Sequence, residues 1–583
     1  MTIKTEQVKA HPSIIIKADG SVYPPGSPIS TTDNVTYTFT ADINEPIGVE
    51  RDNIIINGAN HTLYGGGTFS YGIYLEGRTN VTITSVQVKA FYSGIYLWNS
   101  SDSKVYGNNM TANKDYAIEL IYSSNNRIFQ NNLTANRHAV NFFASSNDNT
   151  MYQNSIANHH DDVAVYISNS FNITLYENTM NDNNYDLEVF GLTLEHFMHS
   201  IDVSNLIDGK PVYYLINQTD LTINPTTHPQ IGYLALVNCF NATVTNLTLT
   251  SNGHGLLLAY TNNSRITDNN MINNYDGILL HASSGNTLSR NNVEFSHYYG
   301  IYLDGNSSDN LIFRSNVTNN KYGIELDVVS NNIVRGNNIN GNEYGIYLWK
   351  SSNSSVHENT FVNNEYGVWI ESELSFPNNR FYHNNFVDNY QHANIYVTGS
   401  YISGHNFWDD GFEGNYWSNY TGFDLDHDGI GDTEHVIGAN NTDNYPLMGM
   451  FDSFDTSLGY NVNVISNSSV EDFHYFESNN TIVMHMSSMT SNQTYGFCRL
   501  AISHELIAPP YNITVNYNPI EHEIIFENET LSIIYFSYEH STLEIIIIPE
   551  SSSPIMLLVI SILTTIPLAF ANKKHRRKAK NAN

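Results

Sequence analysis

Cysteine and basic residues are scarce in this sequence. Cys239 and Cys498 are its two cysteines, and because they lie far apart in unlike surroundings, we expect two buried core residues rather than a disulfide. Lys and Arg total 25 against 57 Asp and Glu, which gives a formal net charge of −32. A chain this acidic repels phosphate backbones, so nucleic acid is excluded as a partner.

Residues that favour helices are scarce as well. Ala, Lys and Glu are infrequent, whereas β-branched residues and the 40 tyrosines are abundant, which favours an all-β fold. Aromatic residues make up 12% of the chain, too much for a disordered protein. Many N-x-[ST] sequons fit an exported glycoprotein; they include Asn34, Asn80, Asn132 and Asn246.

One short block, Gly or Ala followed by aliphatic-x-aliphatic, returns along the chain at steps of 22 or 23 residues. It begins at Gly72, Gly94, Ala117, Ala139, Gly255, Gly277, Gly300, Gly323, Gly345 and Gly367. A period in this range predicts a solenoid, and the fixed leucine frame of leucine-rich repeats is missing. Alternating strands with Asn and Gly at the corners predict a right-handed parallel β-helix of about thirteen coils.

The repeat also predicts how the chain divides. Residues 1–52 form an N-terminal region and cap, and residues 53–450 form the β-helix, whose open end needs such a cap. The repeat breaks near 191–232, where we expect an insertion that leaves the stack. Short alternating strands in 455–549 predict a β-sandwich stalk.

An uncharged apolar run and a basic tail end the sequence. As a helix, residues 554–571 span about 27 Å, close to a hydrocarbon core of roughly 30 Å, and the tail 572–583 is basic. Basic flanks stay cytoplasmic, so we expect a single-pass cell-membrane protein with its bulk extracellular and its C-terminus cytoplasmic. Met1 to Ala10 has no apolar signal core, so we expect the natural chain to begin further upstream.

The acidic loop 424–434 has the spacing of a calcium-binding loop. Carboxylates stand at positions 1, 3, 5 and 9 around Gly429, as at the front of an EF-hand. His435 occupies the position of the usual bidentate Glu, and no flanking helices are apparent. We predict a structural calcium site, with an acidic surface turn as the alternative. The expected ligands are Asp424, Asp426, Asp428, Ile430 through its carbonyl, Asp432 and Glu434.

The most specific motif lies where the repeat ends. It reads Phe407-Trp-Asp-Asp-Gly411, then Gly414-Asn-Tyr-Trp-Ser418 and Tyr445-Pro-Leu447. With Asp208-Gly-Lys-Pro-Val-Tyr-Tyr214, this block resembles NosD-like β-helix proteins, periplasmic accessory proteins linked to copper delivery for nitrous oxide reductase. The resemblance covers residues 50–450 and implies the fold. It also implies copper handling, which many surface proteins with this domain do not share. The stalk is similar to those of archaeal surface proteins.

Two clusters carry donors that copper could use. Met484-His485-Met486 offers thioethers and an imidazole, ligands suited to Cu(I). On a strand, however, His485 points away from both methionines, so core packing is the stronger interpretation. The run His159-His160-Asp161-Asp162 is more typical of a solvated corner of a coil than of a metal site. Copper is therefore the weaker alternative to calcium.

Tyrosines of the repeated Tyr-Gly-Ile-Tyr block predict an aromatic ladder on one face. Its members are Tyr71, Tyr299, Tyr322, Tyr344 and Tyr366, with Trp98, Trp349 and Trp369 nearby. Aromatic faces with polar neighbours suit sugar stacking, although stacking that stabilises the coils is an equal alternative. We therefore predict a cell-surface binding or structural module with glycans as possible ligands.

A polysaccharide hydrolase, lyase or epimerase is the alternative function, and a copper accessory protein the second alternative. The acidic candidates for catalysis are Glu325, Asp327, Glu371 and Glu373. Gly253-His254-Gly255 and Asp161-Asp162 lie about four coils apart, or roughly 19 Å at one rise per coil. That separation is too large for a pair of catalytic carboxyls, so no catalytic residue is assigned.

Overall fold

The computed structural model describes residues 13–67, 70–372, 378–397, 405–438, 441–540 and 543–550. They form two compact units, and each unit is described by itself below. The first unit comprises Met1–Asn379 and Asp388–His405, and the second comprises Arg380–Val387 and Asn406–Asn583. The described residues are almost entirely β-structure; their single short 3-10 helix is Leu194–Phe197.

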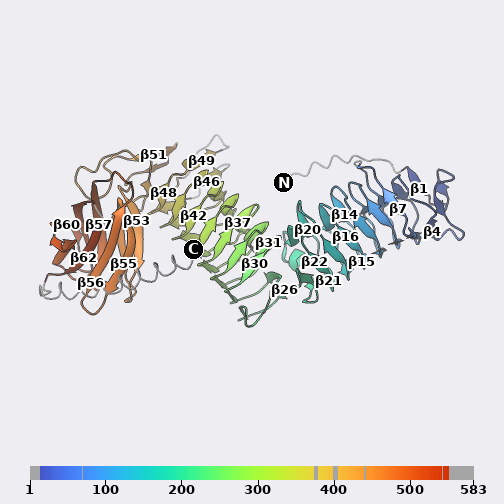
Figure 1. The fold of residues 1–583 in the computed structure, drawn as a ribbon, viewed down its shortest axis with the longest axis horizontal. Coiled ribbons are helices and arrows are strands. Elements are labelled where there is room, and N and C mark those ends of the chain that lie inside the picture. Colours follow the sequence, from blue (N-terminus) through green and yellow to red (C-terminus); the bar gives the residue numbers. More distant parts are fainter. Residues whose placement is uncertain are drawn as a thin grey trace, which may run out of the picture. The chain divides into compact units, whose positions relative to one another are not determined.

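The first unit is a parallel β-solenoid whose strands lie side by side from β1 to β49 (Figure 1). One nine-stranded sheet holds β2 (Val22–Tyr23), β1 (Ile14–Ile16), β5 (Ile47–Val49), β8 (Ile73–Glu76), β11 (Ile95–Trp98), β14 (Tyr116–Ile121), β17 (His138–Phe143), β20 (Val163–Ser168) and β23 (Tyr185–Phe190). Successive strands pair in parallel, as β11 does with β14. The predicted parallel β-helix is therefore confirmed.

A sixteen-stranded sheet runs through most of the solenoid. Its short strands are β7 (Thr62–Tyr64), β10 (Gln87–Lys89), β13 (Asn109–Thr111), β16 (Asn132–Thr134), β19 (Ser155–Ala157), β22 (Thr179–Asn181) and β25 (Leu206–Ile207). Its longer strands are β26 (Lys210–Ile216), β28 (Tyr233–Val237), β31 (His254–Ala259), β34 (Asp276–His281), β37 (Tyr299–Asp304), β40 (Tyr322–Asp327), β43 (Tyr344–Trp349), β46 (Tyr366–Ser372) and β49 (Gln391–Val397). The sheet passes from one set to the other at the antiparallel pair β25–β26.

Aliphatic side chains fill the inside of every coil. Ile95 and Leu97 on β11 pair with Ile118 and Leu120 on β14, and all four are fully buried. Residues two apart on a strand point to the same side, so the repeated aliphatic-x-aliphatic block supplies this core. Each coil can bury its apolar side only against its neighbours.

Asparagine ladders hold the corners of successive coils together. The Nδ2 group of Asn131 donates to Oδ1 of Asn154 at 3.0 Å, and Asn154 donates in the same way to Asn178 at 2.9 Å. These amides are buried, and many corner residues beside them have left-handed backbone angles, such as Gln130 at φ 54° and Gln153 at φ 54°. Asn tolerates such turns and satisfies the backbone groups that they leave unpaired.

Two parts of the predicted fold were wrong. The solenoid has about 16 turns rather than thirteen. The prediction counted only coils with the Gly/Ala block, but β1 and β5 pair in parallel within the expected cap, and β26 within the expected insertion pairs with β28. Strand pairing depends on the backbone, so coils with other side chains still join the stack.

The second error concerns the C-terminus. The expected transmembrane helix at 554–571 lies outside the described residues, and within the described part no helix is both long and apolar enough to cross a bilayer. The prediction of a fold that ends in a transmembrane helix is corrected accordingly. The prediction rested on the length and hydropathy of the run and on its basic flank 572–583, which are properties of the sequence and not of the fold.

The second unit begins with β47 (Arg380–Tyr382), β48 (Asn385–Val387) and β50 (Tyr416–Trp417) and continues as two antiparallel five-stranded sheets. One sheet holds β53 (Met450–Asp455), β54 (Asn461–Ser466), β57 (Tyr495–Ser503), β61 (Leu531–Glu539) and β60 (Glu523–Glu527). The other holds β55 (Ser468–Phe476), β56 (Thr481–Ser488), β62 (Leu543–Pro549), β58 (Tyr511–Val515) and β59 (Asn518–Pro519). A shared apolar core between the sheets makes a β-sandwich.

Candidate functional site

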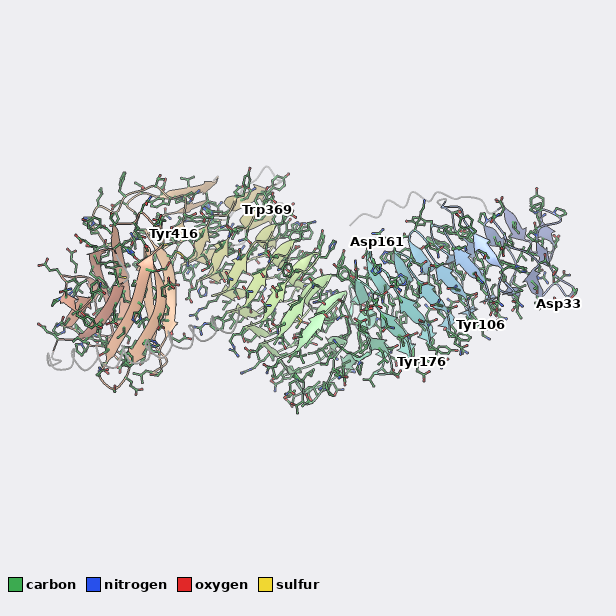
Figure 2. All side chains as sticks on the ribbon, viewed as in Figure 1. Asp33, Tyr106, Asp161, Tyr176, Trp369 and Tyr416 are labelled. Atoms are coloured by element: carbon green, nitrogen blue, oxygen red, sulfur yellow. The ribbon has the colours of Figure 1, made fainter. Side chains whose placement is uncertain are left out.

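Rings and carboxyl groups cover the outward side of the long strands β37 to β46. Tyr302 pairs in register with Glu325 on the next strand, Glu325 with Tyr347, and Tyr347 with Trp369. Parallel strands lie about 4.8 Å apart, so these side chains form one continuous row. We call this surface the tyrosine–carboxylate face; it comprises Tyr299, Tyr302, Asp304, Tyr322, Glu325, Asp327, Tyr344, Tyr347, Tyr366, Trp369 and Glu371. Figure 2 marks the position of Trp369.

The predicted tyrosine ladder forms a second row on this face. The rings of Tyr322 and Tyr344 stack at 4.8 Å, and those of Tyr344 and Tyr366 at 5.2 Å. Tyr299 joins at 5.4 Å with a tilt of 38°, whereas Tyr71 belongs to a separate group on β8 and β11. The rings of Tyr347 and Trp369 in the neighbouring row each meet Tyr344 of this ladder edge-on, at 5.6 Å.

Glu325 is the most perturbed acid of the face. Its side chain is 6% exposed, and burial, together with the carboxylates of Asp327, Asp276 and Asp304, raises its pKa to about 9. Desolvation and like charges both disfavour the ionised form. At neutral pH Glu325 is therefore protonated and can donate a hydrogen bond as well as accept one.

Tyrosine hydroxyls engage the surrounding carboxylates. Tyr302 donates to Oδ2 of Asp327 at 2.9 Å, and Tyr347 donates to Oε2 of Glu371 at 2.6 Å. Burial also raises the pKa of Asp327, and its Oδ1 is a buried atom with no hydrogen-bond partner. The structure thus brings together three of the four acids proposed from the sequence. The fourth, Glu373, lies outside the described residues.

His254 lies much closer to Asp162 than the sequence suggested. The Gly253 N–H donates to the carbonyl of Leu187 at 3.1 Å, so His254 lies beside β23, the strand that pairs with β20. The distance of four coils was wrong because it assumed one step per 22 or 23 residues, whereas residues 251–253 bond directly to β23 through Asp186 and Leu187 although more than sixty residues intervene.

The surroundings of His254 give it a structural role. Its Nε2 contacts the carbonyl of Val189 at 3.2 Å, and its Nδ1 lies 3.5 Å from Oδ2 of Asp276. The ring is 1% exposed and interacts with the carboxyl group of Glu188. Burial lowers the pKa of His254, but the carboxyl groups of Asp276 and Glu188 outweigh this effect and raise it, so the imidazole and these carboxyl groups stabilise one another in the interior.

Three of the predicted calcium ligands converge in the second unit. One carboxylate oxygen from each of Asp424, Asp426 and Asp428 lies within 4.8 Å of the others. Asp424 accepts the N–H groups of Asp428 and Gly429 at 3.0 and 2.9 Å, which fixes the turn. The other predicted side-chain ligands are outside this group: Asp432 is exposed and accepts the N–H of Leu425, and Glu434 is exposed.

The donors needed for copper do not come together in the second unit. Met484 and Met486 are fully buried in the sandwich core, whereas His485 points away from that core to Glu544, with its Nε2 3.3 Å from Oε2 of that residue. Cys498 is buried in the same core without a disulfide.

Histidines of the solenoid do not supply a copper site either. Both ring nitrogens of His159 contact carbonyls, at 2.8 and 3.1 Å, and burial lowers its pKa to about 4. Across the described residues, the one group of three or more His, Cys, Asp or Glu donors is the aspartate triad. All-oxygen ligands suit hard cations such as Ca²⁺ and not Cu(I), so the residues present do not fit copper.

The tryptophan-rich motif is structural. Trp408 and Trp417 are buried and stack on Phe381 and Phe386, each at 4.3 Å. The indole N–H of Trp417 donates to Oδ2 of Asp443 at 2.8 Å. A buried indole N–H needs such a hydrogen-bond partner. This need explains why Asp443 follows the tryptophan-rich motif further along the chain.

Comparison with solved structures matches this chain to several proteins at low identity. The alginate lyase AlyF-OU02 is 12% identical, with a TM-score of 0.23, over 58% of this chain and 80% of its own. The periplasmic alginate epimerase AlgG is 13% identical, with a TM-score of 0.23, over 65% and 80%. A tailspike protein of E. coli bacteriophage HK620, in complex with a pentasaccharide, is 10% identical, with a TM-score of 0.26, over 87% and 79%.

Comparison with protein families identifies the chain more directly. No curated protein matches it. The family model described as periplasmic copper-binding protein (NosD) matches residues 14–192 and 199–422, which is most of the chain and confirms the resemblance carried by the tryptophan-rich motif. The chain therefore belongs to the NosD family.

Proposed function

We propose that the tyrosine–carboxylate face binds neutral glycans. The observation that carries this proposal is the protonated Glu325 in register between Tyr302 and Tyr347. A neutral carboxyl group donates to and accepts from sugar hydroxyls, and aromatic rings beside it pack against the apolar faces of sugars. Polar and aromatic groups in one continuous row suit an extended chain of sugar units.

Charge favours neutral sugars over uronates. The carboxyl groups of Asp327 and Asp304 act on Glu325, Glu371 lies two strands further along the face, and the whole chain carries a net charge of −32. A polyanion therefore meets repulsion both at long range and at the site. We accordingly expect gluco-, manno- or galacto-oligosaccharides to bind and oligouronates to bind weakly or not at all.

Binding is expected to depend on the protonation of Glu325. Its raised pKa keeps the hydrogen-bond donor below about pH 9 and removes it above that pH. Glu325→Gln keeps a donor and an acceptor at every pH, so its affinity should stay level from pH 7 to 10 while the wild-type affinity falls. Isothermal titration with neutral oligosaccharides measures the difference.

A ring outside the face provides the matched control. Tyr106 begins a separate ladder with Phe129, Tyr152 and Tyr176, whose neighbouring rings stack at 4.7 to 4.8 Å (Figure 2). Tyr347→Ala should weaken binding about tenfold, the loss of one stacking and hydrogen-bonding residue, and Tyr106→Ala should not. Equal effects of the two substitutions would contradict the assignment of the face.

A polysaccharide-active enzyme is the second candidate function, favoured by the proximity of protonated Glu325 to further carboxyl groups. Glycosidases pair one protonated and one ionised carboxyl group across the scissile bond. A reducing-sugar assay on every polysaccharide that binds separates the two functions. If the wild type releases reducing sugars and Glu325→Gln does not, the result supports hydrolysis. Binding without release of reducing sugars supports recognition alone.

We also propose that the acidic loop binds calcium through Asp424, Asp426 and Asp428, with Ile430, Asp432 and Glu434 completing the ligand set. Its support is the convergence of three carboxylates in a loop with EF-hand spacing. At calcium concentrations about 100-fold above Kd, binding stabilises the folded state by about 2.7 kcal/mol.

Chelation is expected to lower the melting temperature of the protein. For a unit of this size the shift should be about 5 to 10 °C, measured by calorimetry with and without EDTA. Asp426 is exposed, so Asp426→Asn should fold normally and lose most of this shift. If EDTA does not change the melting temperature of the wild type, the calcium site is ruled out.

A further inference from the structure

Two strands far apart in the solenoid share one sequence pattern. β14 reads Tyr116-Ala-Ile-Glu-Leu120 and β40 reads Tyr322-Gly-Ile-Glu-Leu326. The glutamate stands at the same outward position in both, between the two buried aliphatic residues of the repeat. Glu119 on β14 is therefore the counterpart of Glu325 on β40.

Glu119 and Glu325 share a tyrosine as the neighbour on the preceding strand. Glu119 pairs in register with Tyr96 on the preceding strand and with Asn141 on the following one, and Tyr96 pairs with Tyr74. Glu325 has Tyr302 at the first of these positions and Tyr347 at the second. Residues in register on adjacent strands lie within contact distance.

The environment of Glu119 keeps it protonated as well. Its side chain is 8% exposed and accepts a hydrogen bond from the Ser93 hydroxyl at 2.7 Å. Burial raises its pKa to about 8. At neutral pH it offers the same donor and acceptor as Glu325.

Aromatic rings border Glu119 as they border Glu325. Tyr71 stacks on Tyr96 at 4.1 Å with an interplanar angle of 11°, and Trp98 lies 6.3 Å from Tyr96. Tyr74 donates its hydroxyl to Glu76 at 2.7 Å, as Tyr302 does to Asp327. The two places thus combine rings, carboxylates and one neutral acid in the same manner.

An unsatisfied acceptor lies in register with Glu119. Oδ1 of Asn141 is buried and has no hydrogen-bond partner, and this residue is only 4% exposed. Buried acceptors without a donor are rare in folded proteins. A hydroxyl group of a ligand is a donor that suits this atom.

A third glutamate at the equivalent position repeats only part of this arrangement. Glu188 on β23 pairs with Tyr166 on β20, and burial raises its pKa to about 8, although the charge of the nearby His254 acts against this shift. On β31 and β34, Leu257 and Leu279 pair in register and are buried. Glu188 therefore differs from the other two glutamates in having a buried histidine beside it.

We propose that the partly exposed rings of Tyr74 and Trp98, with the buried Tyr96, Glu119 and Asn141 beside them, form a second binding site for neutral glycans. This inference rests on the proposed function of the tyrosine–carboxylate face. A polysaccharide long enough to engage both sites binds more tightly than a short oligosaccharide, because the second contact forms at a high effective concentration.

Titration with a short neutral oligosaccharide tests the proposal directly. The wild type should bind two molecules per chain, and Glu119→Leu and Glu325→Leu should each bind one. The double variant should bind none. Glu119→Gln keeps the hydrogen-bonding groups and should bind two molecules. This variant separates loss of the site from loss of the fold, and circular dichroism checks that each variant is folded.

The outcomes distinguish this inference from the function on which it rests. One molecule per wild-type chain, with Glu119→Leu unchanged, would overturn the second site and leave the first in place. No binding of any neutral oligosaccharide would overturn both. Glu119→Leu should also weaken binding of the long polysaccharide by about tenfold or more while barely changing the affinity of the remaining site for the short one.

Discussion

Asn131→Ala is expected to destabilise the solenoid by about 3 to 5 kcal/mol. The Asn131 amide donates to the carbonyl of Val105 at 2.9 Å and to Oδ1 of Asn154 at 3.0 Å. Its own Oδ1 accepts the backbone and side-chain N–H groups of Asn108, both at 3.0 Å. Truncation removes the side-chain partner of the Val105 carbonyl and of the Asn108 backbone N–H, both on the preceding coil, and each buried group without a partner costs about 1 to 3 kcal/mol.

The neighbouring residue supplies a control within the same coil. Asn132 is exposed, and its side chain donates to Asn109 at the surface, so Asn132→Ala should change stability by less than about 0.5 kcal/mol. Urea denaturation followed by circular dichroism measures both variants. If the two substitutions cost the same, the ladder contributes little and the aliphatic core alone holds the coils.

Arg499→Met is expected to destabilise the second unit by about 3 to 5 kcal/mol. The Arg499 side chain is 7% exposed, and its Nη2 lies 2.6 Å from Oε1 of Glu413. Its Nη1 donates to the carbonyl of Asp428 in the acidic loop at 2.9 Å. Removing the guanidinium leaves a buried glutamate with His383 as its remaining ionic partner.

The pH dependence of stability below about pH 4.5 tests whether the Arg499–Glu413 ion pair is responsible. Burial alone would raise the pKa of Glu413, but the hydrogen bond from His383 and the charge of Arg499 lower it to about 2. A lowered pKa stabilises the fold above about pH 4.5 and loses that contribution as pH falls toward 2. Arg499→Met should therefore flatten the loss of stability between pH 4.5 and 2.

A double variant separates a charge effect from a packing effect. Arg499→Met combined with Glu413→Gln removes both charges, so much of the stability lost in the single variant should return. A double variant as unstable as Arg499→Met alone would mean that the arginine acts by filling space. Calorimetry on the wild type, Arg499→Met and the double variant decides between these outcomes.

The solenoid could be predicted from the sequence because its cause is local. The aliphatic-x-aliphatic block and the Asn corners repeat in every coil that the period identified, and each has a direct structural effect. The coil count failed at β1, β5 and β26, where the backbone pairs without the usual side chains. Periodicity in side chains detects a coil only if that coil keeps the pattern.

The candidate site was only partly predictable. Glu325 and Asp327 could be proposed because acidic residues are rare in the repeated block, and the spacing of Asp424, Asp426 and Asp428 predicted their convergence. Glu119 was missed, although its strand shares the Tyr-x-Ile-Glu-Leu pattern of β40. Its protonation depends on burial by neighbouring coils, which the sequence of one coil does not reveal. The proximity of His254 to Glu188 depends on where the intervening strands pair.

The equal step between coils also determines which changes in length the solenoid accepts. From β40 to β43 and β46, residues in register are separated by 22 positions. Removing or duplicating one such unit leaves every remaining strand opposite an equivalent neighbour, whereas deleting a single residue within a strand would turn inward side chains outward. Steps of 23 residues from Ile95 to Ile118 and of 25 from Val140 to Val165 show that the corners accommodate single residues. Changes in length should therefore occur as whole coils or at the corners, and a duplicated coil that carried a glutamate would place a further acidic group on the same face.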